Sequence, residues 1–127
     1  MKINKTVIGL TFSMLLVSTV VGAADFGKGL SAAQSGDFKT ALSEWTPLAE
    51  QGHAESQNNL GIMYFEGAGV LTDNRLAYMW VNLSTYHSND ENGPKAKGII
   101  SKKMTPASIS TAQDMSSRCL ESGYTDC

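Results

Sequence analysis

In this chain of 127 residues, the side chains whose chemistry is easiest to predict are the two cysteines, Cys119 and Cys127. A redox-active dithiol needs closer spacing, and a zinc site needs four ligands, to which the sequence adds only His53 and His87. In an oxidising compartment, an isolated pair of nearby cysteines forms a disulfide. The sequence therefore predicts a structural disulfide that joins the end of the chain to the last helix and stabilises the fold by about 2.5 kcal/mol in the chain-entropy model.

Motifs for nucleophilic catalysis or phosphate binding are missing from the sequence. Neither Gly-x-Ser-x-Gly nor Ser-x-x-Lys occurs, and the two histidines lie near predicted helix ends without a matching serine–aspartate pattern. The segment Gly67-Ala68-Gly69 lacks the preceding strand and the third glycine of a nucleotide-binding loop, so we expect it to be a turn between helices. We therefore expect no catalytic, cofactor-binding or metal-binding residues, and no enzymatic activity.

Residues 1–23 have the pattern of an export signal. Lys2 and Lys5 precede a mostly apolar run without charge from Thr6 to Ala24. The run closes on Val21-Gly22-Ala23, whose small residues suit cleavage by signal peptidase, with cleavage after Ala24 as an alternative. An uncleaved anchor is the competing interpretation, since such a helix nearly spans a bilayer core of ~30 Å. Interrupting Ser and Thr residues favour cleavage, which predicts secretion to a bacterial periplasm and no membrane span afterwards.

The composition after residue 23 excludes several classes of protein. Without the two leader lysines, eight of the ten basic residues remain against twelve acidic ones, a net charge near −4. Nucleic acid is therefore not an expected partner. Two Val and four Ile stand against eleven Ala, which favours helices over a sheet. The length suits one domain with a modest core.

Helical periodicity alternates with capping signals along this domain. The expected helices cover about residues 26–35, 38–50, 53–66, 73–86, 94–103 and 106–122. Asp37, Asp73 and Thr105 are their expected N-caps. Leu30 in the first helix, and both Ile99 and Ile100 in the fifth, are expected to face inward.

A repeat with a spacing of 36 residues relates two of these helices. Asp37 and Asp73 occupy one pair of equivalent positions, and Ala41 and Ala77 another. The segment Leu60-Gly61-x-x-Tyr64, followed by Gly67-x-Gly69-Val70, Asp73 and Ala77-x-x-Trp80, resembles the Sel-one-like repeat family. This family is related to the tetratricopeptide repeat and has a longer glycine-rich loop.

The resemblance implies an all-α fold, a short α-solenoid of antiparallel helix hairpins with a C-terminal helical cap. Residues 24–52 would form a degenerate first repeat, residues 53–88 a full repeat, and residues 89–127 the cap with its disulfide. The residues expected to pack the repeats are Trp45, Leu60, Gly61, Tyr64, Gly67, Gly69, Asp73, Ala77 and Trp80.

A binding face is the functional candidate that these features leave. In related repeats, the first helix of each hairpin lines a groove in which a partner peptide or helix docks. In this chain, the corresponding positions are Glu55, Asn58, Ile62, Phe65 and Glu66. The alternative, that Ile62 and Phe65 pack against the preceding repeat, stays open at this point.

The function expected from the sequence is an exported module that binds a partner protein or peptide in the periplasm or envelope. Two alternatives remain. One is a hydrolase or ligand-binding protein acting on cell-wall or β-lactam-like material, because some relatives of this repeat family are connected with β-lactam binding. The other is a structural homo-oligomer that assembles through the open edge of the repeats.

Overall fold

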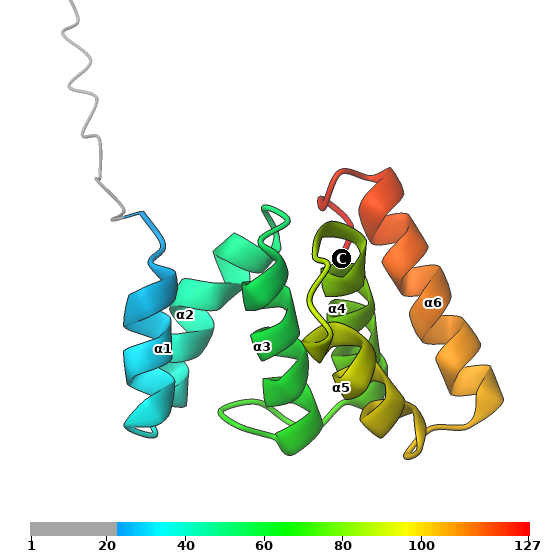
Figure 1. The fold of residues 1–127 in the computed structure, drawn as a ribbon, viewed down its shortest axis with the longest axis horizontal. Coiled ribbons are helices and arrows are strands. Elements are labelled where there is room, and N and C mark those ends of the chain that lie inside the picture. The colour runs from blue at the N-terminus through cyan, green and yellow to red at the C-terminus, as the bar shows by residue number, and fades with distance from the viewer. Residues whose placement is uncertain (1–22) are drawn as a thin grey trace, which may run out of the picture.

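The computed structural model describes residues 23–127, and this part of the chain contains six α-helices and no strand (Figure 1). The predicted all-α class is confirmed. Apart from Ala23, the predicted signal peptide lies outside the described residues. Within residues 23–127, no helix combines the length and apolarity needed to cross a bilayer. The helices are α1 (Phe26–Gln34), α2 (Phe38–Ala49), α3 (Ala54–Glu66), α4 (Asn74–His87), α5 (Asn92–Ser101) and α6 (Pro106–Glu121).

Side-chain caps fix the first residue of most helices. The Asp37 carboxylate accepts from the backbone N–H of Thr40 at the start of α2, and Asp73 caps α4 in the same way. Thr105 caps α6, whose first residue is Pro106. All three predicted caps are confirmed. Asp and Thr suit these positions because their side chains accept hydrogen bonds from backbone N–H groups that the first turn leaves free.

The closest helix pair is α3 and α4, which pack through small residues. A Cβ atom on Gly61 would lie 2.8 Å from the carbonyl oxygen of Ala77 and 2.5 Å from a methyl carbon of Val81. Any larger residue than glycine would therefore push the two backbones apart. Leu60 and Trp80, the chain neighbours of Gly61 and Val81, are both buried in one cluster. The expected packing of Gly61 against Ala77 is confirmed.

The loop between α3 and α4 also follows the sequence prediction. Gly67 ends α3 in the left-handed conformation with φ of 70°, which glycine adopts without steric cost. A Cβ atom on Gly69 would lie 2.8 Å from Cβ of Phe38, so this loop packs closely on α2. Gly67 to Gly69 therefore form a helix-hairpin turn, as predicted.

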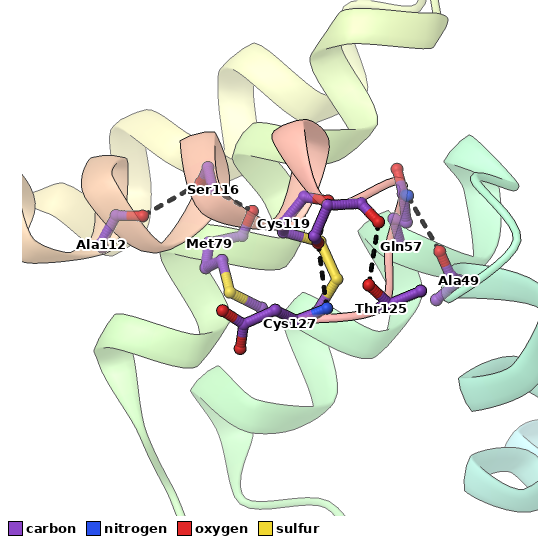
Figure 2. Close-up of a disulfide and its surroundings, with 10 residues drawn as sticks. Ala49, Gln57, Met79, Ala112, Ser116, Cys119, Thr125 and Cys127 are labelled. Carbon is purple, nitrogen blue, oxygen red and sulfur yellow. Dashed lines mark hydrogen bonds between the residues drawn. A yellow bond between two sulfur atoms is a disulfide. The ribbon is translucent and has the colours of Figure 1, made fainter.

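Helix α4 is buried on all sides over two turns, from Ala77 to Ser84. A surface helix has only one apolar face covered by the core. Helix α3 packs against one face of α4, and α5 and α6 pack against the rest. On the α6 side, the Ser116 hydroxyl donates to the carbonyl oxygens of Ala112, at 3.0 Å, and Met79, at 3.4 Å (Figure 2). The hydrophobic core is thus built around α4, which three other helices surround.

Helices α5 and α6 pack mainly against α4 and make little direct contact with each other. Ile100 of α5 and Ala112 of α6 belong to one buried cluster with Ala77, Tyr78 and Val81 of α4. They follow different sides of α4, as Figure 1 shows. This differs from α1 with α2, and from α3 with α4, because in those pairs consecutive helices pack directly on one another.

The first helix corrects one prediction. Leu30 was expected to face inward but is 40% exposed, whereas Ala32 is buried. The reason is Trp45 of α2, whose indole lies so close to Gly29 that a Cβ atom there would be 2.5 Å from its Nε1. Helix α1 thus presents its smallest side chains to the large ring of Trp45, which is 3% exposed, and turns Leu30 away.

Candidate partner-binding face

The five predicted binding residues of α3 line two separate hollows. Ile62, Phe65 and Glu66 belong to the C-terminal half of the helix and line a hollow shared with α5. Glu55 and Asn58 belong to the N-terminal half and line a second hollow beneath the α4–α5 connection. The predicted patch is therefore two neighbouring sites of different chemistry, which we call the apolar hollow and the polar hollow.

The apolar hollow has a volume of about 210 Å³ and lies between α3 and α5. Ile100 is 1% exposed, whereas Ile99 is 56% exposed. Phe65 also packs against the buried cluster around Ala77 and Tyr78. Apart from the Glu66 carboxylate, the walls are hydrocarbon; the lining residues are Ile62, Phe65, Glu66, Ala96, Ile99 and Ile100.

One sequence-based expectation is corrected by this arrangement. Ile99 was expected to face inward with Ile100, but consecutive helical residues point about 100° apart, and only Ile100 meets α4. For Ile62 and Phe65, the sequence left open both a groove and packing against the preceding repeat. In the structure both side chains line a hollow with α5, which follows them in the chain. Ala96 and Ile99 also line this hollow, although neither was among the predicted binding residues.

The polar hollow is smaller, with a volume of about 120 Å³. The Oδ1 atom of Asn58 is buried and has no hydrogen-bond partner. The Asp90 carboxylate is engaged by Asn92, whose backbone N–H and side-chain amide donate to it at 3.1 and 2.7 Å. Its lining residues are Phe26, Ala54, Glu55, Asn58, Asn59, Ser84, Ser88, Asp90, Asn92 and Gly93.

One serine–histidine pair exists, but its geometry is that of a helix cap. Nδ1 of His53 lies 2.8 Å from Oγ of Ser56 and accepts from the backbone N–H of the same serine at 3.2 Å. Ser56 is completely buried, so a substrate cannot reach its hydroxyl. His87 lies exposed at the end of α4. Among residues 23–127, no group of three or more His, Cys, Asp or Glu side chains is placed to hold a metal ion.

The predicted disulfide between Cys119 and Cys127 is confirmed, with the two Cα atoms 4.6 Å apart (Figure 2). It folds the tail back over the molecule. The Tyr124 ring lies 3.4 Å from the position that a Cβ atom on Gly52 would take. The tail thus reaches the turn between α2 and α3. Cys119 itself belongs to the core cluster with Ala49, Leu60, Met79, Trp80 and Leu83.

Comparisons with protein-family models, with curated proteins and with solved structures find no match for this chain. The resemblance to the Sel-one-like repeat therefore depends on the quoted residues alone, and the family enters the functional argument as a proposal.

Proposed function

We propose that this chain is an exported, non-enzymatic interaction module that docks a partner protein or peptide on the face shared by α3 and α5. The observation that carries the proposal is the apolar hollow, where Ile62, Phe65 and the exposed Ile99 form hydrocarbon walls around an open space. Exposed apolar side chains around a concavity are typical of protein-binding sites.

The chemistry of the hollow suggests what the partner presents. An aliphatic or aromatic side chain that fills it would contribute about 1.5–3 kcal/mol by burial alone. Lys95 of α5 and Lys102, which directly follows this helix, are exposed at the positions i−4 and i+3 from Ile99, so they are its neighbours on the helix surface. Lys95 also pairs with Glu91 at 3.1 Å. A partner segment that carries an acidic residue beside its apolar anchor would fit both features.

The packing of the helices supports the same proposal. We interpret α1–α2 and α3–α4 as two hairpins of a short Sel-one-like solenoid, with α5 and α6 as the C-terminal cap. In such repeats, the first helix of a hairpin lines the binding groove. Helix α3 holds this place in the second hairpin, and it supplies Ile62 and Phe65 to the hollow. The open end of the hollow, beside Ile99, comes from the cap.

Site-specific photo-crosslinking tests this function. A photoreactive residue at position 99 in the exported protein should crosslink to a partner, whereas the same residue at position 86 should not. Tyr86 is a matched control because it is 57% exposed, compared with 56% for Ile99, and lies outside the apolar hollow. The crosslink should disappear when Ile62 and Phe65 are both replaced by Ser while the helical circular dichroism persists.

Other outcomes of this experiment have defined meanings. Equal labelling from positions 99 and 86 would contradict a docking site at the hollow. A product from position 99 with twice the mass of the chain would indicate self-association instead of a separate partner. Hydrolytic turnover of cell-wall or β-lactam substrates by the purified protein would contradict the non-enzymatic part of the proposal.

A further inference from the structure

Glu44 is a carboxylate in the interior that the binding function does not use. It lies on α2, is 9% exposed, and turns toward the start of α1. Its Oε1 atom lies 2.6 Å from Nζ of Lys28, and its Oε2 atom accepts the backbone N–H of Asp25 at 2.8 Å. A carboxylate with little solvent access needs such partners, because it has lost most of its hydration.

Both partners keep Glu44 ionised. The hydrogen bond from Lys28, followed by that from the Asp25 N–H, lowers the pKa of Glu44 below its ordinary value. The same contact raises the pKa of Lys28. The carboxylate of Asp25 is already engaged, since it caps α1 by accepting the backbone N–H of Lys28 at 3.1 Å. At neutral pH, the backbone nitrogen of Asp25 therefore faces a fixed negative charge.

This geometry bears on the two cleavage positions that the sequence leaves open. Hydrolysis after Ala24 adds water to the peptide bond between Ala24 and Asp25. The new carboxylate leaves with the leader, and the released nitrogen of Asp25 takes up protons to become an ammonium. That nitrogen is the atom already bonded to Glu44. Cleavage after Ala23 would place the ammonium one residue, about 3.8 Å of chain, further away.

An ammonium at this position needs a nearby anion. The N-terminal end of a helix carries a partial positive charge, so a free amino terminus at the N-cap of α1 is repelled by the helix. Glu44 would offset this repulsion. Its hydrogen bond to the Asp25 nitrogen, which already has an ionised acceptor, would gain a charged donor and become an ion pair.

We infer that signal peptidase cleaves this chain between Ala24 and Asp25, and that Glu44 binds the resulting ammonium group as the receptor for the mature amino terminus. This inference depends on the proposed export. The position of the cut and the fact of export are nevertheless distinguishable in one measurement.

Amino-terminal sequencing of the full-length precursor, expressed in a bacterium and recovered from the periplasm, makes this distinction without any substitution. A mature chain that begins at Asp25 supports the inference. A chain that begins at Ala24 overturns the inference and leaves export intact. Absence of the chain from the periplasm, with only the uncleaved precursor in the cytoplasm, overturns both, whereas an uncleaved chain outside the cytoplasm overturns the inference alone.

Amine labelling of the mature protein tests the role of Glu44. Near neutral pH, an amine-reactive reagent, which reacts with the deprotonated amine, should modify the Asp25 amino group about tenfold faster in E44Q than in the unchanged protein, because Glu44 raises the pKa of this group. E50Q is the matched control, because Glu50 is exposed at the other end of α2, and it should label like the unchanged protein. Equal labelling of E44Q and E50Q, with helical circular dichroism retained, would overturn the role assigned to Glu44.

Discussion

Two regions around α4 are held together by different physical means. The pair α3–α4 depends on a small-residue contact, in which Gly61 lets the two backbones approach. Helices α5 and α6 pack on α4 and make little direct contact with each other, and a disulfide fastens the end of α6. The consecutive helices α3 and α4 are joined by the close approach of their backbones at Gly61. Helices α5 and α6 instead use α4 as a common packing partner, and the disulfide holds the C-terminal tail to α6.

The largest effect that tests this difference is expected from Gly61→Leu. The new side chain would meet the Ala77 carbonyl, which belongs to the backbone and cannot rotate away. Overpacking of this kind costs about 1–3 kcal/mol, and we expect the free energy of unfolding to fall by the upper value. Urea denaturation measures it. An unchanged midpoint would show that α3 and α4 do not depend on close approach.

Removal of the disulfide should have the next largest effect. Cys127→Ser is preferred over a change at Cys119, because Cys127 is exposed and Cys119 is completely buried. The loss of loop closure should reduce the free energy of unfolding by about 2.5 kcal/mol while the helical content stays the same. A reductant should lower the midpoint of the unchanged protein to that of C127S and should leave C127S unaffected. If the reductant destabilises both equally, the covalent closure is not the cause.

A matched pair of glycine substitutions sharpens the comparison at lower energies. Gly98 lies exposed within α5, and a Cβ atom there would have no neighbour within 4 Å. Gly98→Ala should therefore stabilise the protein by about 0.5–1 kcal/mol, because alanine favours the helix. Gly61→Ala should destabilise it despite the same gain in propensity. Opposite signs in urea denaturation would localise the close contact to α3–α4, and equal signs would remove the distinction.

The smallest effect concerns a third means of attachment, the contact of Glu44 with Lys28 that joins α1 to α2. The folded-state pKa of Glu44 is lowered from 4.5, so the unfolded chain takes up this proton first as the pH falls. The stabilising contribution is complete above pH 4.5 and is lost as the pH falls through the folded-state pKa. Thermal melts should show a shallower acid dependence for E44Q than for E50Q, which retains the contact. Parallel curves would contradict the assignment.

The parts of the fold that the sequence predicted are those fixed within a few residues. Asp37, Asp73 and Thr105 cap helices because each side chain reaches N–H groups of its own first turn. The close packing at Gly61 was also predictable, because a glycine on the buried face of a helix indicates that a neighbouring helix approaches closely there.

The rest depended on segments distant in the chain. The burial of Met79 and Leu83 on α4 requires α6, which begins more than twenty residues later. For the binding face, the sequence indicated Ile62 and Phe65 but could not supply the opposite wall, because the path of α5 is set by its packing on α4. Ile99 was placed inward for the same reason. No sequence pattern indicated the role of Glu44, because its partners Asp25 and Lys28 are brought to it only by the packing of α1 against α2.

The complete burial of α4 between Ala77 and Ser84 also sets which positions of the chain can vary. An ordinary surface helix tolerates substitution at about every second or third residue, where its side chains face water. In α4, none of the eight consecutive side chains from Ala77 to Ser84 faces water. In a library of random variants, this segment should appear as an unbroken stretch of intolerant positions, and its amides should be the last in the chain to exchange with deuterium.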